Sequence, residues 1–378
     1  MPRFIHTADW QIGRQYSQCP PDDAVPLAEA RLAVVETLAR LATENKVDAV
    51  VVSGDVFDAQ MVSDKTIRRL FNALEGFPGP WIMIPGNHDA ALTESVWTRA
   101  MRLGVTPANL HLAIQSKVLD FPSLGFAALM APLTQRHTYN DLTEWFDQGL
   151  TVPGLVRIGV AHGSVQGVLA EDIDSANPID SARAASAKLD YLALGDWHGC
   201  KQIDDRTWYS GTPEPDRFKG NEAGYALLVE IDAPGVAPRV TRLETGQFKW
   251  QTWEQNVAVA SDVDEFIVRL AAVGASDVLS IRVAGQIDLA SLQRMRVALG
   301  HTEAKARSVQ ADLAALRLQP TAADIAALKA DGYLGDVIAE LRDKQAGESG
   351  DPTAEVAAHA LGLLTSILTE RQAVGAAA

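Results

Sequence analysis

The sequence predicts a layered α/β fold, followed by a smaller unit of the same class. Three observations predict it. Over the first 250 or so residues, short apolar segments alternate with segments of helical periodicity. Polar side chains that can bind metal ions recur directly after those apolar segments. A new alternation of helix and strand begins near residue 261, and 378 residues are enough for two domains.

The elements of the first region follow from their spacing. Residues 28–42 place Ala28, Leu32, Val35, Ala39 and Ala42 at alternating steps of four and three, which predicts one apolar face of a helix. A second helix is expected over residues 67–74. The continuous apolar segment at 48–52 is typical of a strand buried on both faces. Further strands are expected at residues 4–8, 81–84, 155–161 and 191–194.

The pattern changes towards the end of this region. Residues 225–231 and 239–243 flank the turn-rich stretch DAPG at 232–235, which predicts a hairpin. Beyond it we expect a helix at 262–273, a strand at 278–284 and helices around 288–298, 303–316 and 322–329. GESGDP at 347–352 indicates a linker, and the Ala- and Leu-rich residues 353–373 should be helical. The predicted domains are 1–255, 256–345, and a linker with a C-terminal helix at 346–378.

Composition restricts the class of protein. The net charge is −15, from 33 basic and 48 acidic residues, which opposes binding of DNA by overall charge alone. A local basic stripe or a partner can still hold nucleic acid. Two cysteines are too few for a disulfide framework or a Cys-rich zinc site. The sequence has no run of about 18 apolar residues and no signal-peptide pattern, so we expect a cytoplasmic protein without a membrane span.

Five short segments carry the candidate chemistry. Each follows an apolar strand, and each contains a side chain that can bind a metal ion. Because carboxyl ends of strands form the binding crevice of an open α/β sheet, we expect these segments to converge. They are DWQ at 9–11, GDVFD at 54–58, GNHD at 86–89, AHG at 161–163 and GDWH at 195–198. The glycines at 54, 86 and 195 are expected to let the backbone turn sharply after each strand.

These segments, in this order, resemble the calcineurin-like metallophosphoesterase family over residues 4–220. The family pattern is D-x-H, GD, GNHD, H and a final G-H-x-H. Three stretches further resemble the SbcD-type DNA repair exonuclease subunits, namely HTADW at 6–10, GDVFD at 54–58 and YSGTPE at 209–214. The resemblance implies a four-layer β-sandwich flanked by helices, with a smaller α/β capping domain that helps to shape DNA access.

The resemblance also implies two divalent cations held about 3.5–4 Å apart by a bridging carboxylate. Asp55 is the expected bridge. The first metal position would take Asp9, Asp55, His198 and Gln11, and the second would take Asp55, Asn87, His162 and Asp196. His88 would act beside the metals, stabilising the phosphate or protonating the leaving alkoxide. Either Asp58 or Asp89 could orient it.

Two of these positions depart from the family pattern. Gln11 stands where D-x-H has histidine, and Asp196 stands where G-H-x-H has its first histidine. Both changes replace a nitrogen donor by an oxygen donor, which favours Mn²⁺ or Mg²⁺ over Zn²⁺. The alternatives are that Gln11 contacts a ligand or the substrate instead of a metal, and that Asp196 is a nearby carboxylate that binds no metal.

Four residues are candidate substrate contacts. Arg14 and Arg217 follow motif segments and could meet phosphates, although a solvated surface charge is the alternative. Trp10 could stack a base or wall the site. His137 lies in a polar stretch that could line a substrate groove or be an ordinary solvated loop.

The predicted activity is metal-dependent hydrolysis of DNA phosphodiester bonds in DNA repair. The resemblance implies a homodimer that binds an SMC-like coiled-coil ATPase, with the C-terminal helix either docking this partner or packing on its own domain. The alternatives are a small-substrate phosphatase or cyclic-nucleotide phosphodiesterase on the same fold, and a weakly active regulatory subunit.

Overall fold

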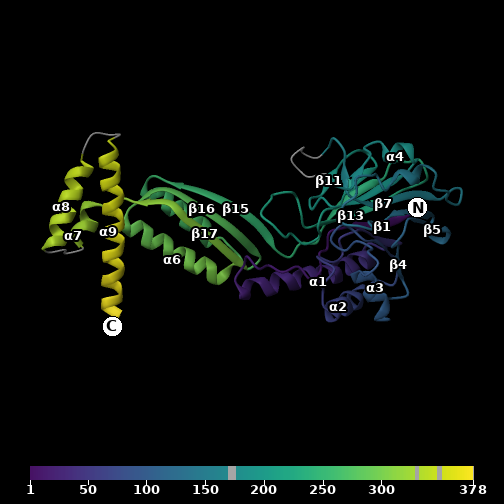
Figure 1. Cartoon of the computed structure of the whole chain (residues 1–378), viewed down its shortest axis with the longest axis horizontal. Helices are drawn as coiled ribbons and strands as arrows, with labels where there is room; N and C mark the ends of the chain where they lie inside the picture. Colours follow the sequence, from purple (N-terminus) through teal and green to yellow (C-terminus); the bar gives the residue numbers. More distant parts are fainter. Residues whose placement is uncertain (169–175, 328–331, 347–350, 378) are drawn as a thin grey trace. The chain divides into compact units, whose positions relative to one another are not determined.

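The computed structural model describes residues 1–168, 176–327, 332–346 and 351–377. They form two compact units, Met1–Phe248 and Lys249–Ala378 (Figure 1). The predicted boundary at residue 255 lies inside a strand, β15 (Lys249–Val257), that pairs with the next strand of the second unit.

Two six-stranded sheets form the first unit. The order in the first is β14-β13-β1-β2-β3-β4, with β1 to β4 parallel and β13 and β14 antiparallel to their neighbours. Its strands are β1 (Arg3–Thr7), β2 (Ala49–Ser53), β3 (Trp81–Ile84), β4 (Leu110–Leu112), β13 (Tyr225–Glu230) and β14 (Arg239–Glu244). The predicted strands at 4–8, 48–52 and 81–84 and the predicted hairpin are therefore confirmed.

The second sheet has the order β11-β12-β10-β7-β6-β5. Its central strands β12, β10, β7 and β6 are parallel, and β5 and β11 run antiparallel at the edges. The strands are β5 (Lys117–Phe121), β6 (Phe126–Ala131), β7 (Val156–His162), β10 (Tyr191–Gly195), β11 (Lys201–Gln202) and β12 (Thr207–Tyr209). Two short strands, β8 (Ser164–Val165) and β9 (Pro178–Ile179), pair separately.

The two sheets pack face to face with helices outside, which gives the predicted four layers. Side chains that alternate along a strand point to opposite faces, so Val51 joins the core between the sheets while Val50 and Val52 face the helices. Helices α1 (Pro21–Glu44) and α2 (Asp64–Leu74) cover the first sheet. The short helices η2 (Glu144–Asp147) and α4 (Arg183–Ser186) lie against the second. The remaining helices of this unit are α3 (Val96–Arg102) and η1 (Pro122–Leu124).

The second unit begins with a three-stranded parallel sheet of order β15-β16-β17. Helix α5 (Ala260–Ala271) connects β15 to β16 (Asp277–Ile287), and α6 (Leu289–Lys305) connects β16 to β17 (Ser308–Leu318). Both helices pack on the sheet through a common apolar cluster, and Figure 1 shows α6 lying along it. Residues 249–318 therefore form a pair of βαβ crossovers.

The predicted helix at 303–316 is wrong, because most of this segment is β17. Its residues pair with β16 from Val278↔Ser308 onwards. The segment SVQADLAALRL contains good helix formers, but pairing with β16 overrides that weak local preference. The helix expected at 288–298 continues to Lys305 instead.

In the described residues after β17, three helices follow: α7 (Ala322–Ala327), α8 (Tyr333–Gln345) and α9 (Pro352–Ala377). Ile338 of α8 and Leu361 of α9 are buried against each other. The helix predicted at 353–373 is confirmed, and it packs at least partly on its own unit. Residues 328–329 of the helix predicted at 322–329, and residues 347–350 of the predicted linker, lie outside the described residues. None of the helices in the described part of the chain has the length and apolar character needed to cross a membrane.

Candidate metal centre

The five predicted segments meet at one edge of the sandwich. Thr7 pairs with Val52 and Ser53 with Ile84 in the first sheet, so β1, β2 and β3 end side by side. In the second sheet His162 pairs with Gly195 at the ends of β7 and β10. Because β2 packs against β7 and β10, residues more than 180 positions apart come together.

The loops that leave these strands hold their polar residues in an uncommon backbone conformation. Asp9, Gln11, Asp55 and Asp196 all have positive φ angles, of 55°, 45°, 52° and 100°. Non-glycine residues rarely adopt this region, at a cost of about 1–3 kcal/mol each, and such strain concentrates at functional sites. Backbone hydrogen bonds offset it, from the Asp9 amide to the Gly54 carbonyl oxygen at 3.1 Å and from the Gln11 amide to that of Asp55 at 2.9 Å.

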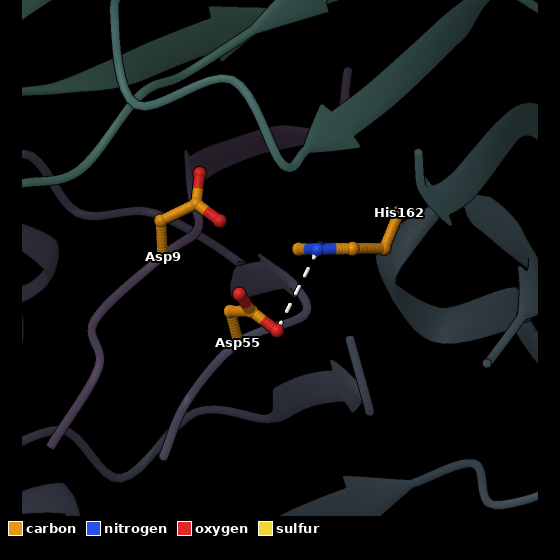
Figure 2. Close-up of side chains that lie close together, drawn as sticks. All are labelled: Asp9, Asp55 and His162. Carbon is orange, nitrogen blue, oxygen red and sulfur yellow. Dashed lines mark ion pairs between the residues drawn. The ribbon is translucent and has the colours of Figure 1, made fainter. Parts of the chain in front are cut away.

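The centre of the site consists of Asp9, Asp55 and His162. All three are buried, and one ligand atom of each lies within 4.8 Å of the others. Figure 2 shows the two carboxylates and the imidazole ring turned towards one another. Nε2 of His162 lies 3.5 Å from Oδ1 of Asp55 and 3.7 Å from Oδ1 of Asp196. Side chains that the sequence predicted as ligands are thus brought to one point.

Two buried polar atoms at this point lack hydrogen-bond partners. His162 donates a hydrogen bond from Nδ1 to the Ser53 carbonyl oxygen at 2.8 Å, which leaves Nε2 facing the site with no partner. The Oδ1 atom of Asn87 is also without a partner, while its Nδ2 donates to Oδ1 of Asp196 at 3.3 Å. A metal-binding histidine commonly has its other nitrogen fixed by a carbonyl in this way. Unpaired buried acceptors beside carboxylates fit a divalent cation.

The electrostatics of the site also favour binding of a divalent cation. Burial raises the pKa of Asp9, and burial raises the pKa of Asp196 to about 6. Burial alone would lower the pKa of His162, but the charges of Asp55, Asp196 and Asp9 outweigh it and raise that pKa to about 9. Without a metal, a proton on His162 therefore compensates the carboxylates, a task that a divalent cation would perform better.

The glycines of the site serve two different purposes. Gly54 has a φ of 92°, so it does provide the predicted sharp turn. Gly86 and Gly195 do not have positive φ angles. A Cβ atom at Gly86 would overlap Oδ1 of Asp55, and one at Gly195 would overlap the Ser53 carbonyl oxygen. At those two positions glycine is needed because other groups of the site approach the backbone.

His88 lies beside this centre rather than in it. Its backbone amide donates to Oδ1 of Asp55 at 2.9 Å, and Nε2 of its ring lies 4.0 Å from Oδ2 of Asp55. Nδ1 lies 2.7 Å from the backbone carbonyl oxygen of Asp58, so a peptide group, and neither candidate carboxylate, orients the ring. The carboxylate of Asp89 instead accepts hydrogen bonds from the amides of Gly86 and Phe57, which shapes the GNHD loop.

The side of the site near Gln11 and His198 is crowded by arginines. Arg14 donates from Nη1 to Oε1 of Gln11 at 2.6 Å, and Nε2 of Gln11 lies 3.2 Å from Nε2 of His198. Nη2 of Arg217 lies 2.9 Å from Nδ1 of His198. Asp216 joins these groups: its Oδ2 lies 3.3 Å from Arg14, 2.8 Å from Arg217 and 3.2 Å from Nδ1 of His198. Both arginines therefore lie beside the predicted site, and their role as substrate contacts stays a prediction.

Asp216 and Arg31 were not predicted from the sequence. Burial would raise the pKa of Asp216, but hydrogen bonds from His198 and Arg217 and the charge of Arg31 hold it well below its usual value. Arg31 is 1% exposed and donates to the backbone carbonyl oxygens of Asp9, Trp10 and Glu214. A signal for Arg31 existed, because it precedes Val35 by four residues and so shares an apolar helix face.

The YSGTPE segment at 209–214 stabilises the loops that carry the site. The Tyr209 hydroxyl donates to the Gly163 carbonyl oxygen at 2.8 Å and accepts from the Val165 amide at 2.9 Å, which fixes the chain just after His162. The Glu214 carboxylate accepts hydrogen bonds from the amides of Gln247 and Phe248 at 2.6 and 3.0 Å, where the first unit ends. The segment is thus a structural support, and its Thr212 hydroxyl accepts from Arg31.

The other two predicted substrate contacts are Trp10 and His137. Base stacking by Trp10 is wrong, and the role of His137 stays a prediction. Trp10 cannot stack a base, because it is fully buried, packs edge-on against Trp81 and donates from Nε1 to the Thr7 hydroxyl. His137 is exposed on the loop between β6 and η2, and its role stays a prediction.

Comparison with known families decides the assignment. The profile of the family described as calcineurin-like phosphoesterase matches residues 2–199, more than half of the chain. The chain belongs to the calcineurin-like phosphoesterase family. This calcineurin-like phosphoesterase is accordingly a metal-dependent hydrolase, and its buried Asp9, Asp55 and His162 fit the divalent metals that the family uses.

Individual relatives give a finer comparison. The phosphoesterase is 26% identical over 338 residues to the D subunit of the nuclease SbcCD of Bacillus subtilis (strain 168), covering 78% of this chain and 83% of that protein. Among solved structures, the protein TT1561 of Thermus thermophilus is similar, with 11% identity and a TM-score of 0.40 over 65% of this chain and 99% of that chain. The second similarity is too low to contribute to the assignment.

Proposed function

We propose that this chain is a nuclease that hydrolyses DNA phosphodiester bonds with the help of two divalent cations. The observation that carries the proposal is the extent of the similarity to the Bacillus subtilis nuclease subunit. The similarity covers 78% of the 378 residues, a larger number of residues than the 248 of the first unit. It therefore extends into the second unit. A phosphatase that shares only the catalytic fold would not need this second unit.

The residues around Asp55 would hold the cations. Asp9, Asp55, Asn87, His162, Asp196 and His198 are the proposed ligands, and bound cations would supply an activated water and compensate charge on the transferred phosphate. Asp196 and Asn87 contribute oxygen atoms, so Mn²⁺ or Mg²⁺ suits the centre better than Zn²⁺. Asp55 is the proposed bridge because its Oδ1 faces His162 at 3.5 Å while its backbone carbonyl oxygen holds the Gln11 loop.

His88 is the proposed proton donor to the leaving oxygen. Its Nδ1 is fixed on the Asp58 carbonyl oxygen, so Nε2 is the nitrogen that can deliver a proton. About a third of its side chain is exposed, 31%, whereas that of Asp55 is buried. An imidazole at the edge of the centre can reach both the substrate and solvent, as a proton donor must.

Binding of DNA would depend on local charge, because the net charge of −15 repels it. Arg14 and Arg217 provide positive charge beside the centre, with side chains 23% and 34% exposed, and guanidinium groups bind phosphate oxygens well. From the sequence resemblance we further propose action in the cytoplasm as a homodimer with an SMC-like coiled-coil ATPase. The role of the second unit in DNA access also stays a prediction.

The test compares substrates and one substitution. The full chain, freed of metal and supplied with Mn²⁺, is incubated with labelled single-stranded DNA and, separately, with p-nitrophenyl phosphate mono- and diesters. We expect cleavage of DNA, and we expect Asp55→Asn to abolish it while leaving the circular dichroism spectrum and the unfolding midpoint intact. Asp205→Asn, which neutralises an exposed carboxylate, is the matched control and should stay active.

Three results would count against the proposal. Hydrolysis of the small esters without any cleavage of DNA would favour a phosphatase or cyclic-nucleotide phosphodiesterase. Absence of bound metal and of Mn²⁺-stimulated cleavage would favour a regulatory subunit. Full activity of Asp55→Asn would remove the proposed bridge.

A further inference from the structure

The two metal positions around Asp55 have different surroundings. The second position, formed by Asp55, Asn87, His162 and Asp196, presents two ligand atoms without hydrogen-bond partners. Nε2 of His162 and Oδ1 of Asn87 are buried without hydrogen-bond partners. Among the residues that the structure describes, no lysine or arginine hydrogen-bonds or pairs with these four side chains. A cation could enter this position without displacing a lysine or arginine side chain.

The first position, formed by Asp9, Asp55, Gln11 and His198, is already engaged. The only oxygen of the Gln11 side chain accepts a hydrogen bond from Nη1 of Arg14 at 2.6 Å. Its amide nitrogen lies 3.2 Å from Nε2 of His198. The other ring nitrogen, Nδ1, lies 3.2 Å from Oδ2 of Asp216. The Asp216 contact could remain, since it leaves Nε2 as the ligand atom, but a metal at this position would have to break the contact between Gln11 and His198 and take the Gln11 oxygen from Arg14.

Charge increases the difference between the positions. The guanidinium groups of Arg14 and Arg217 both contact Asp216, whose carboxylate is fully buried and holds them beside His198. A unit positive charge a few ångströms away lowers the affinity for a divalent cation by roughly tenfold or more, even at the effective dielectric constant of a protein surface. A glutamine oxygen is moreover a weaker ligand than the imidazole that the sequence pattern leads one to expect there.

We infer that the two metal positions bind divalent cations with unequal affinity. One ion binds tightly between Asp55, Asn87, His162 and Asp196. The guanidinium group of Arg14, which contacts Gln11 and Asp216, weakens binding of a second ion at the other position. The inference rests on the proposed metal-dependent function. It adds that Gln11 acts as the acceptor for Arg14 and not as a metal ligand in the resting protein.

Metal binding without substrate tests this directly. The full chain is freed of metal and titrated with Mn²⁺ by equilibrium dialysis, and its electron paramagnetic resonance spectrum is recorded at increasing metal. We expect one tightly bound ion per chain with the resolved hyperfine pattern of an isolated Mn²⁺, and a second ion bound at least about tenfold more weakly. The spectrum of an exchange-coupled pair should appear only when the second ion binds.

Substitutions identify the cause. Arg14→Met removes the charge, and Gln11→His removes its acceptor and restores a nitrogen donor. Each should strengthen binding of the second ion about tenfold or more and bring the coupled spectrum to lower metal concentration. Arg40→Met is the matched control, since Arg40 pairs with Glu44 on the exposed face of α1, and it should leave both affinities unchanged.

The outcomes separate this inference from the proposed function. Two ions of equal affinity in the unsubstituted chain would overturn the inference and leave the nuclease proposal standing. Unchanged second-ion affinity in both Arg14→Met and Gln11→His would do the same. A chain that binds no metal at all would overturn both.

Discussion

Arg31, in the middle of helix α1, donates a hydrogen bond from Nη2 to the backbone carbonyl oxygen of Asp9 at 2.9 Å. The same guanidinium donates from Nε to the Trp10 carbonyl oxygen at 2.7 Å. It therefore fixes the peptide groups on the C-terminal side of Asp9 and Trp10, in a loop where Asp9 has a φ of 55°. A buried positive charge thus holds a proposed metal ligand in a strained conformation without touching its carboxylate.

Replacing Arg31 by Met should destabilise the protein by about 3–5 kcal/mol, because several buried carbonyl oxygens lose their donor. Arg31→Lys keeps the charge but cannot reproduce the planar set of donors, so its stability should lie between those of Arg31→Met and the unsubstituted chain. Urea unfolding of the metal-free proteins measures both effects. Arg40→Met, at an exposed ion pair, should change stability by less than about 1 kcal/mol. Equal stability of Arg31→Met and the unsubstituted chain would contradict this supporting role.

His88→Asn should separate chemistry from metal binding. If His88 donates the proton to the leaving oxygen, its loss should reduce kcat by about 10²–10⁴-fold. Mn²⁺ bound per chain should not change, because the ring lies outside the proposed ligand set, with Nε2 4.0 Å from Asp55. Steady-state kinetics and metal analysis on the same preparation measure both. Loss of metal in parallel with activity would make His88 a ligand instead.

Metal affinity should depend on pH through His162. Its pKa in the metal-free protein is about 9: burial lowers it, but the neighbouring carboxylates outweigh burial. Because an ion at Nε2 must displace that proton, the apparent affinity for Mn²⁺ should decrease as the pH falls below about 9, by up to about tenfold per unit. Calorimetry in buffers of different ionisation enthalpy should detect release of about one proton per ion at neutral pH. A pH-independent affinity with no proton release would refute the assignment of His162 as a ligand.

Glu214 should make the metal-free protein less stable as the pH rises. Burial raises its pKa to about 7 in the folded chain, although hydrogen bonds from Gln247 and Phe248 oppose this. The folded state therefore binds the proton more tightly than the unfolded state, so this contribution is complete below the ordinary pKa of glutamate and is lost as the pH approaches 7.

The substitution Glu214→Gln should remove that dependence. Between pH 5 and 7.5, the difference in unfolding free energy between the unsubstituted chain and Glu214→Gln should shift by on the order of 2 kcal/mol. Relative to Glu214→Gln, the unsubstituted chain should be less stable at pH 7.5 than at pH 5. Urea unfolding at the two pH values measures it, and a constant difference would show that Glu214 does not titrate in this range.

Local sequence patterns were enough to predict the α/β class, the chain positions of the strands that carry the site, and the polar residues that follow them. This was possible because alternating apolar strands and amphipathic helices are local patterns, and because parallel strands present their carboxyl ends at one edge. Asp55 and His162 could therefore be predicted to meet, although 107 positions separate them. The fold of residues 308–318 could not, because β17 depends on pairing with β16 and not on its own composition.

The surroundings of the predicted ligands could be read only from the folded chain. Folding buried Trp10 against Trp81, fixed His88 on a peptide carbonyl group, and brought Arg14 and Arg217 onto Gln11 and His198 through Asp216. The loops that carry these side chains have left-handed backbone conformations, which set the side-chain directions. The positions of the two arginines depend on their shared ion pairs with the buried carboxylate of Asp216. Neither property has a period or spacing along the chain, because both arise only when distant segments compete for the same space and the same charge.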